Sequence, residues 1–195
     1  KSLNTWTASL DPAKPDAAQA LLEALWVFEE HRVPNGELLK KVFRAADGRV
    51  RAAAIRTLGH WGTQVTDWEQ IILTAARDES ALVRAEAVKS AVSFEGMPAA
   101  EVIFEVSTRP TDPELDTVLN FAKGRIQVDR LVQEAVNAKR PLSKAAQIYA
   151  LRNASVDDLL KLERTEAVYE AILSRPNVAA NPLREALNGL SALRK

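Results

Sequence analysis

The sequence predicts an all-α protein, a right-handed α-solenoid of antiparallel helix pairs, and two observations in its 195 residues support that fold. Apolar residues recur with the spacing i, i+1, i+4, which marks the buried stripe of an amphipathic helix and not the alternation of a strand. The same pattern returns after 33 residues, as the aromatic series Phe28, Trp61 and Phe94 shows. A self-similar period between 20 and 50 residues is typical of stacked helical repeats.

Two sets of predicted helices repeat in the same register. The second helix of each pair carries its apolar triplet within residues 21–25, 54–58, 87–91 and 118–122. The first helix of each pair carries its triplet within residues 38–42, 71–75 and 102–106. The last interval shortens from 33 to 31 residues in both sets. A register change shared by two separate segments indicates that the two helices form one structural unit.

Helix-start signals separate the predicted helices. Residues 66–69 (Thr-Asp-Trp-Glu) have the spacing of a capping box. Pro113 follows Asp112 in a predicted first turn, where the missing N–H of proline costs nothing. Ser155 precedes Asp157 and Asp158, whose carboxylates suit a helix N-terminus. We expect a single helical-repeat domain over 1–195, with helix pairs over 1–153 and a helical cap or degenerate repeat over 154–195.

The segments "DGRVRAAAIRTLG" (47–59) and "DESALVRAEAVKSAV" (78–92) carry a family resemblance. Each has an aspartate, then Val-Arg, then small and apolar residues at helical spacing. This pattern resembles the second helix of HEAT repeats, and the similarity extends over residues 16–153. The resemblance implies a HEAT-like solenoid in which each pair buries its apolar stripe against its neighbours, and it implies a scaffold or spacer function.

A second resemblance concerns "LLEALWVFEEHRV" (21–33), "PTDPELDTVLNFA" (110–122) and "AVYEAILSRPNVAANPLREALNGLSAL" (167–193). These segments resemble the helical region of large bacterial proteins, predicted to be exported, that join a sugar-dehydrogenase-type propeller to a c-type haem module. The resemblance implies an exported or periplasmic location, whereas a HEAT array of another kind would be cytoplasmic. Because the sequence starts at Lys1 and stops on an apolar helical pattern, it is expected to be a segment of a longer protein.

Composition excludes several function classes. The 26 basic and 26 acidic side chains balance overall and within each quarter of the chain, which disfavours a nucleic-acid-binding surface. Without cysteine, the chain has no disulfide, thiolate zinc site, thiol nucleophile or covalent c-type haem attachment. No apolar run reaches the ~20 residues of a membrane span. We therefore expect no cofactor, no metal and no catalytic residue.

Five residues are predicted to be structural parts of the repeat. Arg51 and Arg84 occupy the same position in consecutive units, where an arginine can bond an acidic cap or a carbonyl of the neighbouring unit. The alternative is a row of arginines that face a ligand. Phe28, Trp61 and Phe94 are expected to fill the same gap between layers, although a stacking platform for bases or sugars has the same spacing.

Three further residues, Trp26, His60 and Trp68, are candidates for a contact surface. They lie outside the aromatic series or lack a counterpart of the same type in the other units. Glu29, Glu30 and His31 lie together at the end of one predicted helix, and a carboxylate–histidine acid–base or metal site is conceivable there.

The predicted function is a non-enzymatic scaffold or spacer whose concave second-helix surface holds another protein or neighbouring domains of the same chain. Two alternatives stay open: a nucleic-acid-binding HEAT-like domain, as in certain alkylpurine DNA glycosylases, and an accessory domain of an exported or membrane-associated dehydrogenase or cytochrome protein. HEAT-like bilin lyases, where a tetrapyrrole lies against the helices, suggest a further enzyme-accessory function.

Overall fold

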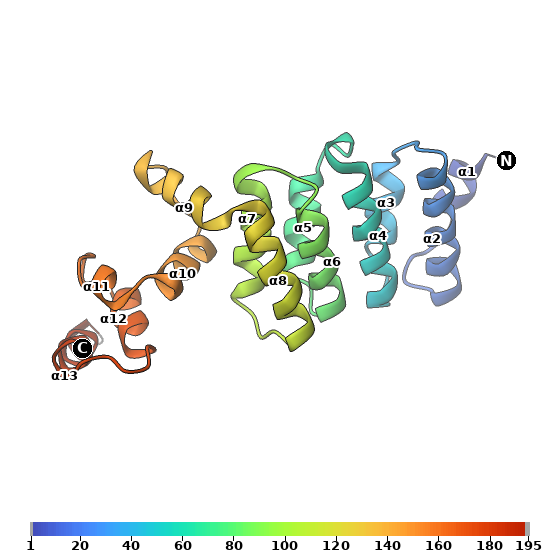
Figure 1. The fold of residues 1–195 in the computed structure, drawn as a ribbon. Coiled ribbons are helices and arrows are strands. Elements are labelled where there is room, and N and C mark those ends of the chain that lie inside the picture. Colours follow the sequence, from blue (N-terminus) through green and yellow to red (C-terminus); the bar gives the residue numbers. More distant parts are fainter. Residues whose placement is uncertain (1, 194–195) are drawn as a thin grey trace. The chain divides into compact units, whose positions relative to one another are not determined.

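A computed structural model describes residues 2–193, in which thirteen α-helices and no strand occur (Figure 1). The all-α prediction is therefore confirmed for this part of the chain. The chain divides into two compact units, unit 1 (Lys1–Arg140) and unit 2 (Pro141–Lys195). Within residues 2–193, no helix combines the length and the apolar character needed to cross a membrane.

Unit 1 contains nine helices and one short 3₁₀ turn within its described residues. These are α1 (Leu3–Ala8), α2 (Pro15–Glu30), α3 (Gly36–Val42), α4 (Gly48–Trp61), η1 (Gly62–Gln64), α5 (Trp68–Ala76), α6 (Ala81–Ala91), α7 (Gly96–Ser107), α8 (Pro113–Ile126) and α9 (Val128–Asn137). Consecutive helices pack as pairs, and successive pairs stack to form an α-solenoid.

The helices of unit 1 form two layers. The second-helix layer consists of α2, α4, α6 and α8, which lie side by side along the unit (Figure 1). In the other layer, α5 packs on α7 and α7 on α9, and an ion pair joins Lys40 of α3 to Asp67, the residue just before α5. All residues of the predicted apolar triplets are buried except Val118, which is half-buried. The repeated stripe seen in the sequence is thus the core between the layers.

The helix predicted to open within residues 66–69 does begin there, but the predicted capping box is absent. Helix α5 begins at Trp68, and its N-cap residue, Asp67, makes no side-chain capping bond. The Asp67 carboxylate instead accepts a hydrogen bond from Lys40 Nζ at 2.7 Å. The other two signals are confirmed, because Asp112 accepts from the Leu115 N–H at the start of α8 and Ser155 accepts from the Asp158 N–H at the start of α11 (Val156–Leu159).

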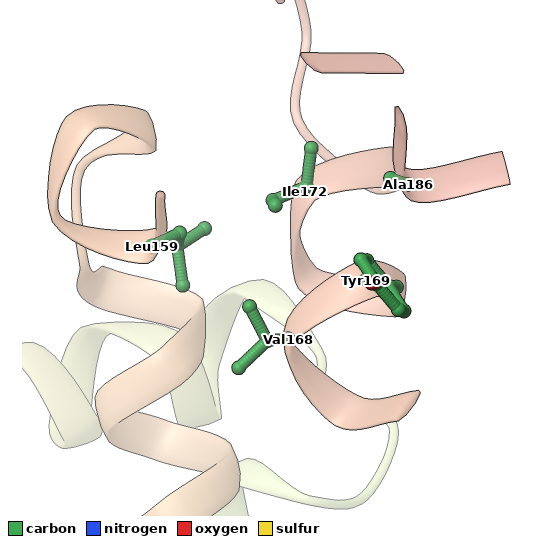
Figure 2. Close-up of a cluster of buried hydrophobic side chains, with 5 residues drawn as sticks. All are labelled: Leu159, Val168, Tyr169, Ile172 and Ala186. Carbon is green, nitrogen blue, oxygen red and sulfur yellow. The ribbon is translucent and has the colours of Figure 1, made fainter. Parts of the chain in front are cut away.

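Unit 2 has its own small core. Its helices are α10 (Lys144–Asn153), α11, α12 (Glu166–Leu173) and α13 (Ala180–Leu193). Figure 2 shows the buried cluster that these helices build, with Leu159 from α11, Val168, Tyr169 and Ile172 from α12, and Ala186 from α13. Helix α10 lies before the boundary expected at residue 154, yet it packs against α12 of unit 2.

Candidate interaction surface

Arg51 on α4 connects three segments of unit 1. Its Nε and Nη2 donate to the two carboxylate oxygens of Asp78 at 2.9 and 2.8 Å, and its Nη1 donates to the carbonyls of Ala45 and Ala46. The Arg51 and Asp78 side chains are only 11% and 10% exposed. The hydrogen bonds to Asp78 raise the pKa of Arg51 above its ordinary value. The guanidinium therefore faces the loop of the next unit and not an open surface.

Arg84 on α6 repeats half of this arrangement. Its Nη1 donates to the carbonyls of Asp78 and Glu79, as Arg51 Nη1 does to the equivalent loop one unit earlier. Its Nη2 reaches the carbonyl of Pro110 in the following loop, at 3.2 Å. No carboxylate stands where Asp78 would be one unit later, and the buried Nε of Arg84 has no hydrogen-bond partner within the described residues.

Further ion pairs join neighbouring units. Glu105 on α7 accepts a hydrogen bond from Arg77, which lowers the pKa of Glu105 below its ordinary value. Glu86 on α6 is 4% exposed and accepts from Lys89 at 2.9 Å and from Arg56 on α4 at 3.3 Å. The basic side chains of the second-helix layer are thus partly neutralised within the solenoid.

The three residues of the aromatic series, Phe28, Trp61 and Phe94, differ in their burial. Trp61 and Phe94 are buried, at 4% and 5% exposure, whereas Phe28 is half-buried. Trp68, a candidate for the contact surface, stacks on Phe94 with 4.0 Å between ring centroids and 3° between planes. One face of Trp68 is therefore used inside unit 1, a pairing between residues 26 positions apart that the repeat did not reveal.

The second-helix layer has an open face made of two rows of side chains. One row is Glu23, Arg56, Lys89 and Asn120, and the other is Val27, His60, Ser93 and Gly124, all of them exposed. The members of the two rows are four residues apart on α2, α4 and α8, so they lie next to each other on one face of each helix, and Ser93 follows Lys89 just beyond the end of α6. We call these eight residues the open face. The open face therefore carries acidic, basic, uncharged polar and apolar residues.

A polar cluster links α2 to α4 beside the open face. Glu29 accepts a hydrogen bond from the Thr57 hydroxyl at 2.8 Å and another from His60 Nδ1. Thr57 is buried, whereas the His60 side chain is 61% exposed. With Nδ1 directed at the carboxylate, His60 presents Nε2 to the surface.

Two surface cavities adjoin this cluster. Trp26, Glu29, Glu30 and Arg32 line one of about 470 Å³. Glu29 and Arg32 also line a second cavity, of about 460 Å³, together with Pro34, His60, Trp61 and Gln64. Trp26 is 45% exposed. The structure thus brings Trp26 and His60 to two cavities that share Glu29, while His31 lines neither. Among the described residues, no group of three or more carboxylate, histidine or cysteine side chains is placed to hold a metal ion.

Two acidic residues that join neighbouring repeat units are absent from the sequence-based prediction. Asp78 and Glu86 receive the arginines of the preceding unit, yet in sequence they look like ordinary acidic residues of a loop and a helix. The available signal is the repeat itself. Each acidic residue follows its arginine by 27 or 30 residues, slightly less than one period, as a contact between consecutive units requires.

Stacked helix pairs with inter-unit arginine contacts define unit 1 as a helical-repeat solenoid. Residues 36–119 match the family model for HEAT repeats, so the segment from α3 into α8 is similar to HEAT repeats. Comparisons with curated proteins and with solved structures returned no significant match.

Proposed function

We propose that this protein is a non-enzymatic scaffold whose open face binds another protein or a neighbouring domain of the same chain. HEAT repeats generally serve in protein interaction. The observation that supports the proposal here is the pair of exposed rows, which continue without a buried member along the second-helix layer. A continuous surface of varied chemistry suits a protein partner, which offers equally varied side chains.

The charges of the open face favour a protein over a nucleic acid. Arg56 and Lys89 both pair with Glu86, and Glu23 adds a carboxylate at the same repeat position. A phosphate backbone is bound by concentrated and unpaired cations that displace its counterions. We therefore expect no salt-dependent binding when duplex DNA is titrated against the protein at low ionic strength.

The scaffold could also act as a spacer within a longer chain, and its partner would then be a neighbouring domain of that same chain. The resemblance to exported dehydrogenase–cytochrome proteins supports this version, in which the open face would contact a flanking module. We propose no catalytic step for Glu29, Glu30 or His31, because Glu29 is engaged by Thr57 and His60 and because HEAT repeats are typically non-enzymatic.

Site-specific photo-crosslinking in the source cells tests the scaffold function. The photoreactive residue p-benzoylphenylalanine is placed at Val27 or Asn120 on the open face and, as a control, at exposed Glu69 on α5. We expect one discrete crosslinked protein, or one discrete intramolecular product, at the open face and none at Glu69. Equal products at all three positions, or none at any, would contradict the proposal.

A further inference from the structure

We call the cavity of about 470 Å³ beside Trp26 the Trp26 cavity. It is lined by a large aromatic side chain and two carboxylates. Trp26, Glu29 and Glu30 are three or four residues apart on α2, so they share one face of the helix. Arg32, just beyond the helix, completes the lining. Two carboxylates against one guanidinium leave the lining with an excess of negative charge.

The backbone adds to this negative potential. The cavity lies at the C-terminal end of α2, which is the negative end of the helix dipole. The N–H groups of Arg32 and Val33 return to the carbonyls of Glu29 and Phe28, a closing turn that places Arg32 in the left-handed region at φ 55°. This turn fixes where the chain leaves the helix, at Arg32, which lines the cavity.

The two carboxylates of the Trp26 cavity differ in their hydrogen bonds to the rest of unit 1. Glu29 is held by Thr57 and His60, which fix its position. Glu30 is exposed and makes no hydrogen bond or ion pair with another described side chain. A partner can therefore bind Glu30 without breaking a contact that stabilises unit 1.

We propose that the Trp26 cavity binds an arginine side chain of a partner segment, with the guanidinium against the exposed indole of Trp26 and paired with Glu30. A planar guanidinium stacks on an aromatic ring and bonds a carboxylate with two N–H groups, which an ammonium cannot do. The cavity volume of about 470 Å³ accommodates such a group. This site rests on the proposed scaffold function, since it lies beside Val27 and His60 of the open face.

Peptide titration followed by NMR tests the site on the intact chain. The probe is the acetylated, amidated peptide Gly-Ser-Arg-Ser-Gly, and the matched peptide carries citrulline, which keeps the shape of arginine without its charge. We expect the arginine peptide to shift the Trp26 indole N–H signal and the Glu30 amide signal, and the shift to shrink as salt is added. Trp26→Leu or Glu30→Gln should weaken binding about threefold or more.

Two matched variants test whether the loss of peptide binding is specific to Trp26 and Glu30. Trp6→Leu removes another half-exposed tryptophan, and Glu69→Gln removes another exposed glutamate, so both should bind the peptide as the unmodified protein does. Equal shifts with the citrulline peptide, or equal loss in Glu69→Gln and Glu30→Gln, would overturn the arginine site, as would the absence of any shift at millimolar peptide. Crosslinks at Val27 that persist in such a case would leave the scaffold function standing.

Discussion

Arg51 shows how one side chain can hold consecutive repeats together. The loop between α3 and α4 contains carbonyl groups that no helix pairs, and Arg51 Nη1 donates to two of them, those of Ala45 and Ala46. The remaining N–H groups bind Asp78 with both carboxylate oxygens, the geometry in which arginine–carboxylate pairs are strongest. Because both groups are nearly buried, the loss of either one leaves an unpaired charge inside the solenoid.

Replacing Arg51 by alanine should therefore destabilise unit 1 strongly. We expect a loss of about 3 kcal/mol in the free energy of unfolding, because Asp78 would remain buried without its partner. The measurement is urea denaturation followed by circular dichroism. Arg49→Ala is the matched control, since Arg49 is 84% exposed and pairs only with Asp47 of its own helix start. Equal midpoints for the two variants would refute the linking role of Arg51.

Trp61 and His60 are adjacent in sequence but differ in burial, and this difference predicts different effects of mutation. Trp61→Ala should cost about 3–5 kcal/mol, since the indole is 4% exposed and its loss leaves a cavity. His60→Ala removes an exposed bond to Glu29 and should cost less than about 1 kcal/mol. Thermal denaturation of both variants distinguishes the two effects, and similar shifts in melting temperature would contradict the packing role assigned to Trp61.

At the scale of helices, α4 and α6 are packed closely because small residues meet where they cross. A Cβ atom on Gly59 would lie 2.8 Å from Ser90 Oγ and 3.2 Å from the Ser90 Cα. The same Ser90 hydroxyl donates to the Ile55 carbonyl at 2.9 Å, a bond that requires the two helices to stay close. Gly59 is thus explained by the approach of the α6 backbone and not by a turn.

Gly59→Ala should destabilise unit 1 by about 1–3 kcal/mol, because α6 must move to admit the new methyl group. The matched variant is Gly124→Ala in α8, where a Cβ would meet nothing within 4 Å. That change should stabilise the protein by roughly 0.4–1 kcal/mol through the lower entropy of the unfolded chain. Chemical denaturation of both variants provides the comparison, and stabilisation in both would show that α4 and α6 can separate at little cost.

Glu86 makes the contact between α4 and α6 sensitive to acid. Burial raises the pKa of Glu86, but the hydrogen bonds from Lys89 and Arg56 outweigh it and the pKa lies below the ordinary 4.5. A carboxyl group whose pKa is lowered by folding adds stability above its unfolded pKa and loses it as the pH falls through the folded value. The free energy of unfolding should therefore decrease from about pH 5 to about pH 3. Glu86→Gln should show a smaller decrease, and an unchanged slope would argue against this contribution.

The sequence was sufficient to predict the helices of unit 1 and their buried faces, but it was insufficient to predict which side chains of different helices contact each other. The apolar triplets identified the buried residues because burial on one face of a helix imposes a period on the chain. The partners of Thr57, Trp68 and Asp67 were not predictable, since each depends on which side chain of another helix reaches that position. The capping box predicted with Thr66 at the N-cap does not form, because α5 has Asp67 at the N-cap and so begins one residue later than that spacing requires.

At the scale of the whole molecule, the two units differ in how they are built. Unit 1 repeats one contact pattern, so its stability is approximately a sum over pairs and their interfaces. Unit 2 lacks the repeat and depends on one cluster around Tyr169 (Figure 2). The loss of the 33-residue period after residue 155 marks this change in the sequence, although unit 2 already begins with α10.

Gly189→Ala should destabilise unit 2 and leave the stability of unit 1 unchanged, and one experiment can measure both effects. A Cβ on Gly189 would lie 2.2 Å from Cζ of Tyr169, and the buried Tyr169 ring would have to leave the cluster that unites α11, α12 and α13. In hydrogen exchange read by mass spectrometry, peptides from α12 and α13 should lose protection while those from α4 and α6 keep theirs. Gly59→Ala should give the reverse pattern. Loss of protection in both units from either change would show that residues 1–140 and 141–195 unfold as one cooperative body.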